Sequence, residues 1–149
     1  VLIGLRSSGP HSNGYTLIRK LFNGDKEIGK QLVEPTRIYV KEVMNLIKQV
    51  EVHGIAHITG GGLDNISRIN NGFQYVIDNP LPIPPVFDWL QKRGEIETKE
   101  MYRTFNMGMG MIIIVDKNDT EKSLSLLGKY AQIIGSVKNG NGVIHTEIN

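Results

Sequence analysis

The 149-residue chain is long enough for one domain with a substantial hydrophobic core. Its net charge of +2 is spread along the chain, which argues against a dedicated nucleic-acid-binding protein. The absence of cysteine excludes disulfide scaffolds, thiol nucleophiles and cysteine-based zinc sites, and it fits a cytoplasmic location. No apolar run reaches the ~18 residues that a membrane span needs, so we expect no membrane partner.

The first fifty residues predict one strand and two helices. A strand over residues 1–5 leads into a loop over 6–14 that is rich in Ser, Gly and Pro. Ser12 or Asn13 is expected to cap a helix over residues 14–22.

A polar connection over residues 23–30 precedes the second helix, which is expected over 35–50 with Pro35 in its first turn. Four apolar residues at spacings of three and four predict the buried face of this helix: Val40, Val43, Ile47 and Val50.

The remainder of the chain predicts alternating strands and helices, with two consecutive strands at the end. Strands are expected over 53–59, 73–78 and 107–116, helices from residue 63 and over 86–93, 97–105 and 119–130, and a closing hairpin around 139–142. In the helix over 119–130, Leu124, Leu127 and the following Ala131 are expected to point inward. This order predicts an α+β fold in which helices cover a mixed sheet.

A glycine-rich turn follows the strand that ends near His57. Thr59 and the three glycines Gly60, Gly61 and Gly62 lead directly into a helix. Glycine amides at the start of a helix suit an anion such as phosphate, but a tight turn alone also favours glycine. The turn matches neither the Walker A pattern nor the Rossmann pattern.

Two histidines are candidates for proton transfer. His57 ends the strand before the glycine turn, and His11 lies in the loop over 6–14. Each is equally compatible with a hydrogen-bonded structural residue. His53 and His57 share a side of the strand, but no third ligand follows at a suitable spacing, and we expect no metal site.

The loop around His11 carries several polar groups. Its hydroxyl and amide side chains come from Ser7, Ser8, Ser12 and Asn13. Helix capping explains Ser12 or Asn13 but leaves the two preceding serines unexplained, so both a capping loop and a binding loop stay open.

The segment Asn106–Met111 reads NMGMGM, and its two glycines share one face of a strand. Either a helix packs closely on this bare face or another group lies against it. Arg68 and Arg103 either bind a phosphate or lie on the surface beside carboxylates.

Taken together and in order, five segments resemble the C-terminal half of aminoimidazole ribonucleotide synthetases, also called phosphoribosylformylglycinamidine cyclo-ligases. The segments are GLRSSGPHSNGYTLIRK, EPTRIYVK, IAHITGGG, FDWLQ and EMYRTFNMGMGM. The resemblance covers at least residues 1–135 and implies a three-layer α/β/α domain, with residues 1–149 forming the C-terminal domain.

The resemblance also implies an activity. These enzymes use ATP and Mg²⁺ to close the imidazole ring of formylglycinamidine ribonucleotide in purine biosynthesis. It implies that His57 and His11 are catalytic, either one carrying the proton. It further implies that ten residues contact substrate or phosphate: Ser7, Ser8, Gly9, Ser12, Asn13, Thr59, Gly60, Gly61, Gly62 and Arg68.

Two departures from the family pattern limit these expectations. The N-terminal half, which is implied to bind most of the ATP and Mg²⁺ and to form the homodimer, is not in this chain, so we expect little activity from it alone. The segment TGGGLDNISR is one residue shorter than the usual family motif, which affects the roles of Asn65 and Arg68.

Other functions stay open beside the cyclo-ligase. The equivalent domain of formylglycinamide ribonucleotide amidotransferase or selenophosphate synthetase shares looser forms of the same motifs. A non-catalytic module that binds a phosphorylated metabolite is the alternative outside enzymes.

Overall fold

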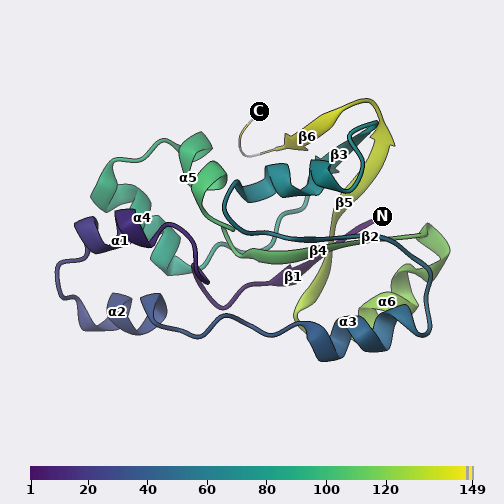
Figure 1. Cartoon of the computed structure of the whole chain (residues 1–149), viewed down its shortest axis with the longest axis horizontal. Helices are drawn as coiled ribbons and strands as arrows, with labels where there is room; N and C mark the ends of the chain where they lie inside the picture. The colour runs from purple at the N-terminus through teal and green to yellow at the C-terminus, as the bar shows by residue number, and fades with distance from the viewer. Residues whose placement is uncertain (147, 149) are drawn as a thin grey trace.

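A mixed sheet of six strands organises the chain in the computed structural model, which describes residues 1–146 and 148 (Figure 1). Its strands are β1 (Leu2–Arg6), β2 (Val52–His57), β3 (Phe73–Ile77), β4 (Met109–Val115), β5 (Ala131–Asn139) and β6 (Gly142–His145). They lie side by side in the order β2-β4-β1-β5-β3-β6. All neighbours are antiparallel except β3 and β6, which are parallel.

Helices connect the strands. The α-helices are α1 (Tyr15–Leu21), α2 (Lys26–Leu32), α3 (Val40–Ile47), α4 (Pro85–Gly94), α5 (Thr98–Thr104) and α6 (Thr120–Leu127). Two 3₁₀ segments, η1 (Gly62–Arg68) and η2 (Lys117–Asp119), complete the set. Within the described residues, no helix is both long enough and apolar enough to span a bilayer.

A hydrophobic core lies against each face of the sheet, since successive side chains of a strand point to opposite sides. On β1, Ile3 and Leu5 join a core with Leu46 of α3 and Leu127 of α6. Leu2 points the other way, into a larger core shared with α1, α4, α5 and η1. The fold is therefore α+β in three layers, as expected.

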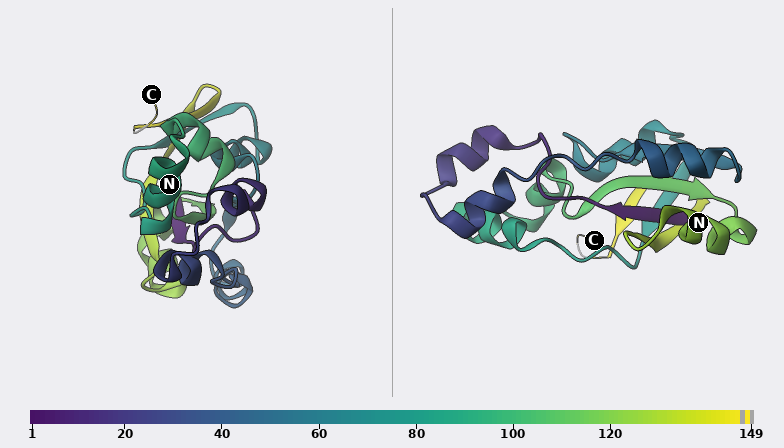
Figure 2. Two further views of the ribbon diagram at one scale, coloured as in Figure 1. Left: turned by 90° about the vertical axis from the view of Figure 1, so that its left-hand side faces the viewer. Right: turned by 90° about the horizontal axis from the view of Figure 1, so that it is seen from below.

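The helices are unevenly distributed along the sheet. In both figures α1 and α2 lie at one end, beyond the strands, while α3 and α6 lie side by side under the sheet (Figures 1 and 2). The long axis of the molecule therefore runs from this helical end along the sheet.

The predicted polar connection over 23–30 is wrong, because it contains most of α2. The Asp25 carboxylate accepts hydrogen bonds from the N–H groups of Glu27 and Ile28, at 2.9 and 3.1 Å, and so caps this helix. Leu32 at its end is buried. The helix α1 is capped differently from the prediction: its N-cap is Gly14, without a side-chain bond from Ser12 or Asn13.

The helix predicted over 35–50 is shorter and is rotated relative to the expectation. Residues 35–39 are irregular, and α3 packs on the sheet through Leu46, with Val50 buried just beyond its end. Val40 and Ile47 are instead 65% and 44% exposed. The predicted buried face is therefore half right, because Val43 and Val50 do pack on the core while Val40 and Ile47 do not.

Two predictions near the C-terminus are also wrong. The helix over 119–130 ends at Leu127, since Gly128 takes a positive φ of 76°, and Ala131 belongs to β5. The last two strands do not form a hairpin, because β3 lies between β5 and β6.

Candidate functional site

Three aromatic side chains from distant parts of the sequence meet at one end of β2. His11 comes from the loop after β1, Tyr39 precedes α3, and His57 ends β2. The centroids of each pair of these rings lie 6.2 Å apart. The structure thus brings together the two histidines that the sequence singled out and adds a tyrosine that it did not.

Gly110 provides the space for this cluster. A Cβ atom at Gly110 would collide with the Tyr39 hydroxyl and lie 2.9 Å from His11 Cε1. The bare strand face is therefore covered by functional candidates rather than by a helix. Gly108 is explained separately by its positive φ of 94° and by its contact with Pro82.

His11 is held in one chemical state. Its side chain is 5% exposed, and its backbone takes a φ of 57°, a left-handed conformation that histidine tolerates better than most residues. The Ser8 N–H donates to Nε2 at 3.2 Å. Burial, aided by the neighbouring His57, lowers the pKa of His11 from 6.5 to about 4, so the imidazole is neutral at pH 7.

Tyr39 ties the segment before α3 to β1. Its hydroxyl donates to the Arg6 carbonyl at 2.9 Å, and burial raises the pKa of this hydroxyl above its usual range. The Arg37 guanidinium lies 5.4 Å from the Tyr39 ring centroid and forms an ion pair with Glu42. The only sequence signal for Tyr39 was its place in the motif EPTRIYVK.

The polar groups of the serine loop differ in how they are bonded. The Ser8 hydroxyl donates to the Pro35 carbonyl at 2.7 Å and accepts from Arg37 N–H at 3.1 Å. The Gly9 carbonyl accepts from the Asn106 amide, and Ser12 is exposed. Among the described residues, two buried atoms of this loop lack a hydrogen-bond partner: Ser7 Oγ and His11 Nδ1.

Glycine at the three positions of the turn is explained differently at each one. Gly62 is required by packing, since a Cβ there would collide with the Tyr102 carbonyl of α5. Gly61 is required by its φ of 97°. Gly60 has an ordinary φ, and its Cβ would meet only Asn13 Oδ1, at 3.4 Å. A tight turn therefore accounts for two glycines and leaves Gly60 unexplained.

Part of the turn is internally bonded and part is open. Gly62 N–H donates to the Thr59 carbonyl at 2.9 Å, and the Asn65 side chain donates to the carbonyls of this turn. No hydrogen bond between described residues uses the N–H groups of Gly60 or Gly61. The Arg68 guanidinium reaches to 3.6 Å from where a Gly61 Cβ would lie. Two amides without a partner among the described residues and a nearby guanidinium suit an anion.

His57 separates two hollows. The first, of about 350 Å³, is lined by His57, Thr59, Asn65 and Arg68 together with apolar residues of β2 and η1. The second, of about 340 Å³, is an almost wholly apolar groove formed by residues 37–40, Val43, Met44, His57 and Met111. An exposed histidine between a polar and an apolar surface is well placed to reach a bound molecule.

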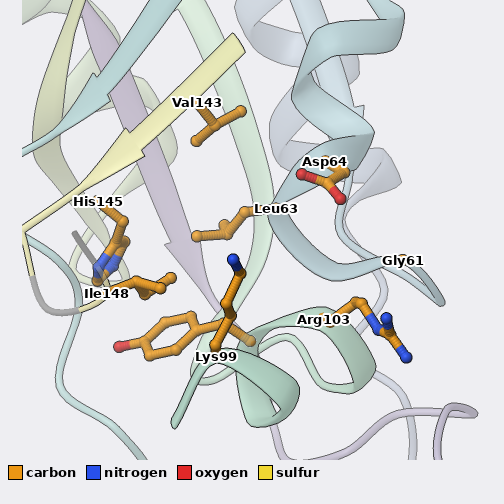
Figure 3. A pocket seen from close by; sticks show the side chains of 9 residues that line it. Gly61, Leu63, Asp64, Lys99, Arg103, Val143, His145 and Ile148 are labelled. Carbon is orange, nitrogen blue, oxygen red and sulfur yellow. The ribbon is translucent and has the colours of Figure 1, made fainter.

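A smaller hollow, of about 150 Å³, also borders Gly61 (Figure 3). Lys99 of α5 extends toward Leu63 inside it, and the Arg103 side chain extends toward the Gly61 turn. Arg103 lies 3.0 Å from the Glu100 carboxylate, which matches the surface alternative for this arginine. Lys99 was not identified from the sequence, because a lone exposed lysine carries no pattern.

The described part of the chain contains no group of three or more His, Cys, Asp or Glu side chains placed to hold a metal ion. His53 lines a different hollow from the one beside Thr59. The described residues around His57 therefore do not fit a magnesium site.

Comparison with known proteins assigns this sequence to a family. The sequence model named AIR synthase related protein, C-terminal domain, matches residues 1–147. The chain belongs to this family. The resemblance drawn from its motifs is thereby confirmed.

Relatives of the AIR synthase C-terminal domain include two named Phosphoribosylformylglycinamidine cyclo-ligase. The one from Methanopyrus kandleri is 44% identical, over 96% of this chain and 45% of its own length. The one from Coxiella burnetii is 45% identical, over 94% of this chain and 44% of its own length. The chain thus spans about half the length of these curated relatives.

The fold of this AIR synthase C-terminal domain is also found in a solved structure titled Hydrogenase Maturation Protein HypE. That structure matches with a TM-score of 0.63 at 18% identity, over 92% of this chain and 44% of the other. At this identity the likeness concerns the fold alone.

Proposed function

We propose that this chain is the C-terminal domain of a phosphoribosylformylglycinamidine cyclo-ligase. The complete enzyme closes the imidazole ring of formylglycinamidine ribonucleotide in an ATP-dependent reaction of purine biosynthesis. The observation that carries the proposal is the meeting of His11, His57 and the open amides of Gly60 and Gly61 at one end of β2. Relatives at 44% and 45% identity favour the cyclo-ligase over the amidotransferase and selenophosphate synthetase alternatives.

The site's groups suit this chemistry in defined ways. Ring closure needs a proton carrier and donors that stabilise charge on oxygen. The exposed imidazole of His57 suits the first requirement. The amides of the glycine turn and the Arg68 guanidinium suit a phosphate group of the nucleotide. Thr59 and Asn13 lie around this turn, and the Ser7–Gly9 loop borders His11.

The domain is proposed to act in the cytoplasm, together with an N-terminal half. That half is proposed to bind most of the ATP and Mg²⁺ and to form the homodimer. Exposed apolar side chains on α3 and just before it support the proposal that a partner covers this surface. Ile38, Val40 and Met44 are 77%, 65% and 46% exposed, and they border the apolar groove that ends at His57. An apolar surface of this kind marks an interaction site.

The test is a chimera. The matching portion of the Methanopyrus kandleri relative is replaced by this chain, and formation of aminoimidazole ribonucleotide from formylglycinamidine ribonucleotide and ATP is measured. We expect turnover by the chimera and little by the 149-residue chain alone. A folded chimera without turnover contradicts the cyclo-ligase proposal. Tight substrate binding by the chain alone, measured by calorimetry, favours the non-catalytic module instead.

A further inference from the structure

Asn106 joins two parts of the chain that are far apart in the sequence. It lies between α5 and β4 and is 1% exposed. Its side-chain amide donates to the Gly9 carbonyl at 2.9 Å, and its side-chain oxygen accepts from the Gly108 N–H group at 2.9 Å. The partners fix which end is oxygen, since a backbone N–H group only donates and a carbonyl only accepts. The bond from Asn106 to Gly9 is called the tether, because it reaches the serine loop (residues 6–14).

The turn that begins at Asn106 has an unusual backbone. The Met109 N–H group donates to the Asn106 carbonyl at 2.9 Å, and φ is positive at both central residues, 47° at Met107 and 94° at Gly108. Positive φ at both central positions is typical of a type I′ turn, in which glycine, asparagine or aspartate is usual. Methionine rarely adopts such a φ. Strained backbone of this kind persists only where surrounding contacts hold it, and it clusters at functional sites.

The same turn holds the serine loop at a second point. The Ser7 N–H group donates to the Gly108 carbonyl at 2.9 Å. The next residue, Ser8, donates its N–H group to His11 Nε2. Beyond the turn, β4 continues into Gly110, which leaves the space for the His11 ring. The position of His11 relative to β4 therefore depends on how the loop is fixed to this turn.

We propose that Asn106 is a positioning residue for the candidate site, which fixes the serine loop, and with it His11, against the start of β4. Because Asn106 is buried, it acts on a bound molecule through the loop and not by contact. The positioning of the loop does not depend on the identity of the substrate. Its effect on the nucleotide rests on the proposed function.

Two substitutions separate the tether from the turn. Asn106→Ser keeps a hydroxyl that accepts from the Gly108 N–H group, as serine does more weakly in such turns, but lacks the amide that reaches Gly9. Asn106→Ala removes both bonds. The matched control is Ser123→Ala, which removes a bond from a fully buried hydroxyl to the Asp119 carbonyl, at 2.7 Å, in α6. This control reports what a general loss of stability does.

The first test uses the 149-residue chain without substrate. Native-state hydrogen exchange, followed by NMR, separates local opening from global unfolding. In both Asn106 variants we expect exchange of the Ser7 and Ser8 amides to accelerate ~10-fold more than that of the Ile113 amide in β4, as for loss of one hydrogen bond. Ser123→Ala is expected to show no such excess. Equal acceleration in the loop and in β4 in the Asn106 variants overturns the proposal.

Kinetics of the chimera test the consequence for the substrate. A smaller folded fraction lowers kcat and leaves KM unchanged, whereas a displaced binding loop raises KM for the molecule that it contacts. We expect Asn106→Ser to raise KM for formylglycinamidine ribonucleotide and to lower kcat/KM by ~10–10²-fold, a usual loss for misplaced groups. KM for ATP should stay within about twofold, because ATP is proposed to bind mainly to the N-terminal half.

The outcomes distinguish this proposal from the proposed function. A loss confined to kcat, or kcat/KM within threefold of the parent, shows that Asn106 serves stability alone and overturns its positioning role. An inactive parent chimera contradicts the proposed function, and the exchange measurement then decides whether Asn106 positions the loop. If the alanine variant does not fold, the serine variant decides both tests.

Discussion

The imidazoles of His11 and His57 lie 6.2 Å apart between ring centroids, yet one is buried and the other exposed. Their closeness depends on Gly110, whose missing side chain leaves space for the His11 ring. The pair therefore exists only when β1, β2 and β4 are assembled.

Replacing His57 by alanine is expected to reduce turnover of the chimera by ~10²-fold or more, which is a usual loss for a general acid or base. The control is His53→Ala, which changes an exposed histidine of the same strand outside the site. Steady-state kinetics of both variants provide the comparison. Turnover of the His57 variant within threefold of the parent removes this residue from the mechanism.

Gly60→Ala and Gly62→Ala are expected to have different effects, the first on substrate binding and the second on stability. The Gly60 variant should fold with nearly unchanged stability, because its Cβ meets only Asn13 at 3.4 Å, but should raise the KM for the nucleotide by crowding the free amides. The Gly62 variant should lose stability, because its Cβ collides with the Tyr102 carbonyl. Thermal unfolding and kinetics separate the two effects. Unchanged KM in the Gly60 variant supports a purely structural turn.

Stability is expected to fall in acid through His11. The pKa of His11 is about 4 in the folded chain and 6.5 for an ordinary histidine, so the unfolded chain binds more protons between these values. The contribution is fully present above pH 6.5 and is lost as the pH falls toward 4, by about 3 kcal/mol when complete. Urea unfolding at several pH values measures it. His11→Asn should remove this part of the pH dependence. If the free energy of unfolding of this variant depends on pH as in the parent, His11 is not its source.

The exposed side of α3 is expected to contact the N-terminal half. Met44→Asp should leave the isolated chain folded, because this side chain is 46% exposed, but should weaken the chimera's resistance to thermal unfolding. Gln49→Asp, which makes the same change in charge at an exposed position just after α3, is the control. Equal effects of the two variants count against a contact at this surface. Self-association of the chain alone, measured by sedimentation, identifies a second copy as the occupant instead.

The strands were largely predictable from sequence, but their pairing was not. Apolar runs identify β2, β3 and β4 within a few residues. The closing hairpin was predicted from a local turn signal, and the pairing of β6 with β3 depends on contacts that no local pattern encodes. The face of α3 failed for a related reason. Val40 and Ile47 fit the apolar spacing with Val43 and Val50 as well as Leu46 does, but of these three only Leu46 is buried.

The candidate site was predictable as residue types but not as an arrangement. His57, His11 and the glycine turn stand out in the sequence, and the structure places them together. The burial of His11 and the part played by Tyr39 depend on packing between distant segments. The sequence also could not separate Gly60 from Gly62, because their difference lies in the neighbouring α5. The assignment of roles within the site stays a prediction.

The position of β3 between β5 and β6 has a consequence for how the chain folds. Both β5 and the last strand pair with Phe73–Ile77, which is far away from them in the sequence, and not with each other. Pairings of such long range are slow to form. We therefore expect the C-terminal edge to assemble late, and a nascent chain that ends before residue 131 to hold β3 without a neighbouring strand.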